Sequence, residues 1–213
     1  MQLWNHAIAR ILERMEDTRK RVGNNYPHWC DYETGKWTTT VDGDWTGGFW
    51  PGMHWLAAKY TGDHRYRAQA LALAQGLKNR VAVESVFKSF PFYFGGVLGA
   101  VLFQDKEATD FAIAGARSLA AMHNPLLKLI PLGAQAEEGE NVSNVESSID
   151  SLHASPFLLW GCGGFRRREN AADRPAACGE RHPLASAQGQ FLYSVVDARC
   201  ERKAGQTSHP QGL

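Results

Sequence analysis

The stretch Leu56-Ala-Ala-Lys-Tyr-Thr-Gly-Asp63, followed by Tyr66-Arg-Ala-Gln-Ala-Leu-Ala-Leu-Ala74, is similar to a second stretch further along the chain. The second copy reads Gly99-Ala-Val-Leu-Phe-Gln-Asp105, followed by Ala108-Thr-Asp-Phe-Ala-Ile-Ala-Gly-Ala116. The aspartates at 63 and 105 are 42 positions apart. A helix, a short turn and a second helix recurring at this period predict stacked αα-hairpins, in a solenoid or a closed helical toroid. Each aspartate is expected to cap the helix that follows it.

Helical periodicity extends on both sides of this repeat, which predicts an all-α fold. Apolar side chains at helical spacing indicate helices over 2–22, 48–60, 64–80 and 106–122. The segment 90–103 is apolar all round, so we expect a buried element, and its length favours a helix. Residues 27–44 are predicted to form a loop that contains one short strand at Trp37–Val41. A third inner helix is expected to end at Phe157-Leu-Leu-Trp160.

The totals exclude several classes of protein. The chain of 213 residues suits one domain, and its formal charge of +1 indicates no general attraction to nucleic acid or anionic membrane. Residues 1–15 carry charges throughout, unlike a signal peptide or a membrane span, so we expect a cytoplasmic protein. None of the four Cys forms a CxxC pair, which favours free thiols over a zinc or redox site.

The last part of the chain differs in composition from the rest. After Trp160 the residues show no helical period, and the triplet Arg166–Arg168 has the form of a solvated run of charge. We therefore expect residues 1–160 to form the helical domain. Residues 161–213 are expected to be an irregular tail, either disordered or not native to that domain.

The stretch Asn141–Trp160 holds the candidate catalytic groups. Ser143 and Glu146 have the spacing of a capping box at the start of a helix. Within such a helix Glu146, Asp150 and His153 share one face, and repulsion between the two carboxylates raises the proton affinity of at least one. A general acid requires this, although a cap alone also explains Glu146. The apolar face of the same helix is expected to comprise Val145, Ile149, Leu152 and Phe157.

Aromatic side chains gather before residue 60, where six of the seven Trp lie. Trp45, Phe49 and Trp50 surround a helix start, where they pack in the core or provide a platform for a sugar ring. Trp45 is the better candidate for a platform because it precedes the helix. His54 and His64 have no partners at metal-ligand spacing, so no metal site is predicted.

Two of these segments resemble a known family, the unsaturated glucuronyl hydrolases of glycoside hydrolase family 88. The first is Asp44-Trp-Thr-Gly-Gly-Phe-Trp-Pro-Gly-Met-His-Trp-Leu-Ala57 with Tyr60-Thr-Gly-Asp63. The second is Ser148-Ile-Asp-Ser-Leu152 with Phe157-Leu-Leu-Trp160. The resemblance spans about residues 3–160 and corresponds to the first half of the family's length. It therefore implies an incomplete (α/α)6 barrel of about half the usual size.

By this resemblance Asp150 is the acid/base, and the substrate is an oligosaccharide with a 4,5-unsaturated uronic acid, as polysaccharide lyases produce. We expect Trp45, Phe49, Glu146 and His153 to bind it, with no cofactor. The family's His-Asp pair before the fourth helix is replaced here by Val86-Phe87. A second acidic partner is then missing unless Glu84 or Glu146 takes its place.

Three hypotheses follow from the sequence. The first is an unsaturated uronyl hydrolase that uses Asp150. The second is a catalytically inactive fragment that retains at most carbohydrate binding. The third is a helical-repeat module that binds a protein partner. In each case half a toroid leaves inner-helix faces around residues 90–103 without neighbours, which predicts self-association.

Overall fold

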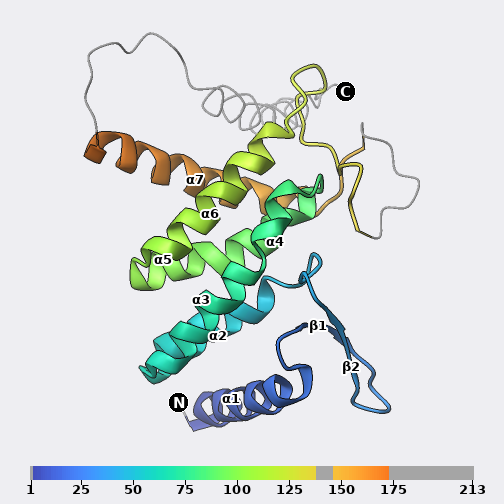
Figure 1. Cartoon of the computed structure of the whole chain (residues 1–213), viewed down its shortest axis with the longest axis vertical. Coiled ribbons are helices and arrows are strands. Elements are labelled where there is room, and N and C mark those ends of the chain that lie inside the picture. Colours follow the sequence, from blue (N-terminus) through green and yellow to red (C-terminus); the bar gives the residue numbers. More distant parts are fainter. Residues whose placement is uncertain (1, 138–145, 173–213) are drawn as a thin grey trace, which may run out of the picture.

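The computed structural model describes residues 2–137 and 146–172. Figure 1 shows a stack of helices with one small β-hairpin near helix α1 (Gln2–Val22). Helix α7 (Ser151–Ala172) crosses the opposite end of the stack. The prediction of an all-α fold built from helical hairpins is confirmed. Helix α1 has the predicted bounds, and Gly23 follows it with a left-handed φ of 61°.

The β-hairpin consists of β1 (Tyr26–Cys30) and β2 (Trp37–Thr40), which pair antiparallel. Only β2 was predicted; β1 contains Pro27, which lacks a backbone donor and is unusual inside a strand. In a two-stranded sheet both strands are edges, so the missing donor costs little. The hydroxyl of Tyr26 donates to the Leu73 carbonyl at 2.6 Å, which attaches the hairpin to helix α3.

Helices α2 (Phe49–Thr61) and α3 (His64–Gly76) form the first αα-hairpin. Helices α5 (Leu98–Phe103) and α6 (Lys106–Ala121) form the second. The Asp63 side chain accepts the Arg65 N–H at 2.9 Å, and the Asp105 side chain accepts the Ala108 N–H at 3.1 Å. Both capping predictions are therefore confirmed. Helix α3 ends earlier than predicted, and the 3₁₀ turn η1 (Lys78–Ala82) follows it.

The apolar segment predicted as one helix is divided into short pieces. They are α4 (Ser89–Phe92), the π-turn η3 (Tyr93–Val97) and α5, and the 3₁₀ turn η2 (Val86–Lys88) precedes them. The indole N–H of Trp55, which is fully buried, donates to the Gly95 carbonyl inside the π-turn at 2.8 Å. A side chain at Gly96 would collide with Phe111 and Ala112 of α6, so the two segments pack at close range.

The core lies between α2, the α4–α5 segment, α6 and α7. Its large buried members are the following: Trp50, Trp55, Leu77, Phe92, Phe111, Leu119 and Phe157. The 18 residues Val86–Phe103 are apolar enough to span a membrane by composition alone. Half of that segment is buried inside this core, as in a core helix.

Helix α7 differs from its prediction at both ends. It begins at Ser151, so Glu146 lies before the helix and the capping-box start is wrong; Ser143 and Val145 lie outside the described residues. The predicted apolar face is wrong in part, because Ile149 and Leu152 are 80% and 62% exposed, whereas Phe157 is buried. The backbone stays helical past Trp160 to Ala172, so the boundary expected at 160 falls inside a helix. Residues 173–213 lie outside the described part of the chain.

Candidate functional site

Asp150 is the residue immediately before α7. Its carboxylate accepts a hydrogen bond from the Ser148 hydroxyl at 2.7 Å, and that hydroxyl accepts the Asp150 N–H at 3.2 Å. The Asp150 carbonyl accepts the His153 N–H at 2.9 Å, which closes the turn. The Asp150 residue is half-buried. The sequence of this turn therefore fixes the backbone at the candidate acid through short-range hydrogen bonds.

Glu146 does not lie on a helix face with Asp150, as the sequence predicted. It is exposed, in the extended segment before α7, and its carbonyl accepts the Leu132 N–H at 2.8 Å. The physical reason is that the Glu146 backbone bonds to Leu132 and the helix begins only at Ser151. The argument for a raised proton affinity from two carboxylates on one helix face is therefore wrong for this pair.

His153 lies in the first turn of α7, and three aromatic rings contact it. It stacks on Phe90 with ring centroids 4.5 Å apart and on Phe94 at 5.3 Å, and Tyr93 meets it edge-on at 4.9 Å. Its Nδ1 lies 3.3 Å from the hydroxyl of the buried Ser89. Burial lowers the pKa of His153, and the charge of Asp150 opposes this in part. His153 is therefore neutral at pH 7.

Trp45 and Phe49 lie against the same aromatic rings. Trp45 has its ring centroid 5.9 Å from Phe90, 6.3 Å from Phe87 and 6.5 Å from Phe49. Phe49 lies 4.8 Å from Phe94 and is 37% exposed. Trp50, by contrast, is buried beside His54 and belongs to the core. Core packing therefore applies to Trp50, whereas Trp45 and Phe49 remain accessible enough to form a platform.

These rings form one continuous surface, which we call the aromatic wall: Trp45, Phe49, Phe87, Phe90, Phe94 and His153. It joins the start of α2, the η2–η3 segment and the start of α7, three segments far apart in sequence. Of the five predicted site residues, three lie in this wall, Asp150 lies in the same turn as His153, and Glu146 lies apart. Aromatic rings at a surface can cover the apolar face of a sugar ring.

Sequence reasoning missed three members of the wall, Phe87, Phe90 and Phe94. Phe90 and Phe94 belong to the segment 90–103, which was interpreted as buried because it is apolar all round, and Phe87 precedes that segment. In the structure all three are half-buried. Phe87 also stands where the resemblance leads one to expect an acidic residue, and Val86 beside it is fully buried. Glu84, the other candidate partner, is exposed.

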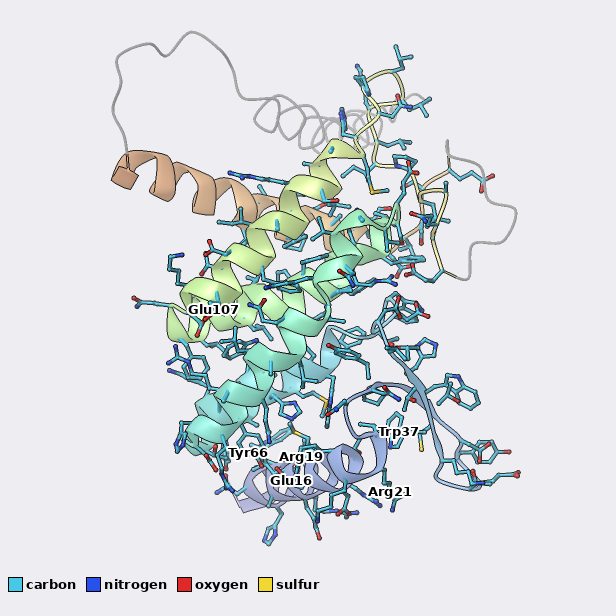
Figure 2. All side chains as sticks on the ribbon, viewed as in Figure 1. Glu16, Arg19, Arg21, Trp37, Tyr66 and Glu107 are labelled. Atoms are coloured by element: carbon cyan, nitrogen blue, oxygen red, sulfur yellow. The ribbon has the colours of Figure 1, made fainter. Side chains whose placement is uncertain are left out.

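A separate hollow lies away from this wall. It has a volume of about 310 Å³ and lies between α1, the β-hairpin and α2, where Trp37 approaches α1 (Figure 2). Its lining includes Ile11, Met15, Trp50 and Met53 and none of the predicted site residues. Within residues 2–137 and 146–172, no three His, Cys, Asp or Glu side chains are grouped so that they could hold a metal ion.

No family model matches the chain. The unsaturated glucuronyl hydrolase of Bacillus sp. (strain GL1) is 27% identical over 165 residues, which cover 74% of this chain and 42% of that relative. A solved structure of the Bacillus sp. GL1 hydrolase, described as responsible for glycosaminoglycan degradation, has a TM-score of 0.69 at 24% identity. The match covers 86% of this chain and 46% of the chain in that structure.

Two further solved structures have the same fold. A variant hydrolase with the oligosaccharide dGlcA-Glc-Rha-Glc has a TM-score of 0.67 at 25% identity, over 79% of this chain and 46% of that chain. The hydrolase from Streptococcus agalactiae has a TM-score of 0.68 at 18% identity, over 88% and 44%. The chain thus spans less than half the length of these relatives. It is a distant, partial homologue of the unsaturated glucuronyl hydrolases of glycoside hydrolase family 88, with a fold that matches about half of their (α/α)6 barrel.

Proposed function

We propose that this chain removes the unsaturated uronic acid from the non-reducing end of oligosaccharides made by polysaccharide lyases. The observation that carries the proposal is the aromatic wall, which brings Trp45, Phe49 and His153 together beside the turn that holds Asp150. Homology to enzymes named for this activity adds independent support.

In the proposed reaction Asp150 is the acid and then the base. Its carboxylic acid gives a proton to C4 of the C4=C5 double bond, and a water oxygen bonds to C5. The second proton of that water returns to the carboxylate, so Asp150 is regenerated. The product of addition is a hemiketal, which opens and releases the rest of the oligosaccharide. The step consumes one water and needs no oxidant or reductant.

The aromatic wall has two roles in this proposal. Trp45 and Phe49 cover an apolar face of the sugar and fix the double bond near the acid. The neutral His153 has one ring N–H and one acceptor nitrogen. Ser89 engages Nδ1, so Nε2 is the nitrogen proposed to bind a sugar hydroxyl.

The test is loss of the ultraviolet absorbance of a lyase-made unsaturated disaccharide. Asp150→Asn is expected to lower kcat/KM at least about 10³-fold, because it removes the proton donor. Asp110→Asn, in the middle of α6 beside Lys106, is the matched control and is expected to leave turnover unchanged. Equal activity of the Asp150→Asn and unsubstituted chains would refute the role of Asp150.

A second candidate is carbohydrate binding without turnover. It is favoured by Phe87, whose ring packs on Trp45 at the place where the resemblance leads one to expect an acid. This alternative predicts no change in absorbance at any pH. It also predicts that the disaccharide binds equally to the unsubstituted and Asp150→Asn chains by calorimetry, and that Trp45→Ala weakens binding to both by the same factor.

A further inference from the structure

Arg80 is a buried cation that the proposed chemistry does not use. It lies in η1 and is 4% exposed. Its Nη1 donates to the Asp42 carboxylate at 3.1 Å, and its Nη2 forms an ion pair with the Glu137 carboxylate. These two acids belong to segments 95 positions apart in the sequence, before α2 and before α7. Arg80 thus joins the two segments that border the aromatic wall.

The first of these connections leads to Trp45 through the turn that precedes it. The carboxylate of Asp42 also accepts the Asp44 N–H at 3.3 Å, and the Asp44 carboxylate accepts the Trp45 N–H at 2.6 Å. Gly43 and Asp44 have left-handed φ values of 83° and 50°. For Asp44 this conformation is unfavourable without such local hydrogen bonds. The Asp42 side chain, which is 61% exposed, thus bonds both Arg80 and the turn that leads to Trp45.

The second connection runs from Glu137 to the Trp45 ring through Ser85 and Phe87. The Glu137 carboxylate accepts the Ser85 hydroxyl at 2.9 Å, and that hydroxyl accepts the Phe87 N–H at 3.1 Å. The Phe87 ring packs on Trp45. Ser85 is fully buried and the Glu137 side chain is 15% exposed, so bulk water does not replace these bonds.

We propose that Arg80 is a positioning residue for Trp45: its guanidinium holds Asp42 and Glu137 at a fixed separation and so fixes both supports of the indole ring. The planar fork of arginine donates to two acids at once, which the single ammonium of lysine does not do with defined geometry. Only the consequence for sugar binding rests on the proposed function. The fixed geometry of the turn does not.

The first experiment measures the geometry alone, by hydrogen exchange of the full chain. Arg80→Met is expected to speed exchange at least about tenfold in peptides covering 42–49 and 84–88, because the N–H groups of Asp44, Trp45 and Phe87 lose their ordered acceptors. The matched control is Arg65→Met, which removes an exposed arginine that pairs with Asp63, the cap of its own helix α3. Unchanged protection of both peptides in Arg80→Met would overturn the proposal. So would full protection in Arg80→Lys, because charge alone would then suffice.

The second experiment asks whether Arg80 acts through Trp45, by a double-mutant cycle on the Kd of the unsaturated disaccharide. Arg80→Met is expected to weaken binding about tenfold in the unsubstituted chain and less than twofold in the Trp45→Ala background. In an active chain KM rises by the same factor while kcat changes little. A general structural role would weaken binding equally in both backgrounds, and that result would overturn the proposal.

The two experiments separate the failure of this inference from the failure of the proposed function. If the unsubstituted chain binds no sugar, the proposed function fails, and hydrogen exchange still decides the role of Arg80. If sugar binds and the exchange rates do not change in Arg80→Met, the inference about Arg80 fails and the proposed function stands.

Discussion

The two helical hairpins, α2–α3 and α5–α6, begin their second helix with the same capping residue but in different surroundings. At the first junction Asp63 pairs with Arg65, two residues further on, and the Arg65 side chain is 78% exposed. At the second, the Asp105 side chain is 9% exposed and pairs with Arg67 of α3 at 2.8 Å. The same local sequence therefore makes a surface cap in one hairpin and a buried contact between hairpins in the other.

The charge balance at the two caps differs for the same reason. Hydrogen bonds from Arg65 lower the pKa of Asp63 to about 2. At Asp105 burial acts to raise the pKa, but hydrogen bonds from Arg67 and from the Ala108 N–H outweigh it and the pKa is lowered. The repeated sequence thus specifies which residue caps each helix. The stacking of the hairpins decides how much that residue contributes to the free energy of unfolding.

The largest effect is expected from Asp105→Ala. It removes the cap of α6 and the contact to Arg67, so the free energy of unfolding in urea should fall by about 2–3 kcal/mol. Asp105→Asn keeps a capping side chain and should recover roughly half of that loss. A loss no larger than that of Asp63→Ala would contradict the comparison.

The same lowered pKa gives a pH dependence to this contribution. A carboxylate whose folded pKa is depressed contributes stability that is present above its unfolded pKa, near 4, and is lost as the pH falls further. The difference in stability between the unsubstituted chain and Asp105→Asn should therefore shrink as the pH is lowered from 5 toward 2. A constant difference across that range would indicate that the ion pair adds nothing.

A second test concerns Lys88, which is 2% exposed and donates to Ser118 of α6, in the second hairpin. Burial lowers its pKa to about 8; the charge of Glu84 opposes this shift and that of Arg80 adds to it. Lys88→Met should raise the free energy of unfolding at pH 7 by about 2 kcal/mol. The carbonyl of Val81, which Lys88 contacts, keeps the Ser118 hydroxyl as a donor.

The pH effect for Lys88 has the same sign as that for Asp105, because both pKa values are lowered in the folded chain, but it falls in an alkaline pH range. Between pH 8 and about 10.5 the unfolded chain binds more protons at this lysine than the folded chain, so stability rises with pH. Denaturation curves of the unsubstituted chain should show this rise, and those of Lys88→Met should lack it. A parallel rise in both would assign the effect to another group.

Asp63→Ala is the third test and should shift the urea midpoint less than half as far as Asp105→Ala. Its cap and its ion pair are local and exposed, so water replaces much of what is lost. The measurement is a pair of urea curves at the same salt concentration. Raising the salt should reduce the already small effect further, whereas the Asp105→Ala effect should persist because that carboxylate is buried.

The smallest effect on stability is expected from Leu56→Glu, on the exposed side of α2. Phe49, Met53, Leu56 and Tyr60 follow each other at helical spacing there, with exposures of 37%, 39%, 54% and 53%. We expect the chain to self-associate through such exposed apolar side chains. Light scattering at increasing concentration should show a lower average mass for Leu56→Glu than for the unsubstituted chain, with the same urea midpoint. A monomer at high concentration without the substitution would contradict this expectation.

Most helices could be predicted from the sequence because their signals are short-range. The stripe of α1, the glycine after it, and the caps at Asp63 and Asp105 all act within one or two turns. The start of α7 was predicted wrongly because a contact distant in sequence prevails over the local signal. Ser143 and Glu146 have the spacing of a capping box, yet Glu146 bonds through its carbonyl to Leu132, a partner that the local sequence does not indicate.

The candidate site was predictable only in part. Trp45, Phe49 and His153 were proposed from a motif position, a helix start and helical spacing, and the structure brings their rings to the same group of phenylalanines. Phe87, Phe90 and Phe94 could not be identified, because composition does not reveal which rings of an apolar stretch are only half-buried. The role inferred for Arg80 was equally hidden, since its two acids lie 38 and 57 positions away.

The sequence alone determined the period of the hairpins, the residues that cap their helices and the segments that resemble a hydrolase family. The tertiary structure decided which of two equivalent aspartates is buried, which aromatic rings form a wall, and which carboxylates share one guanidinium. Helix formation and capping arise between residues a few positions apart, so they are encoded locally. Burial and long-range pairing arise only when the hairpins stack, because stacking removes water from groups that no local pattern relates.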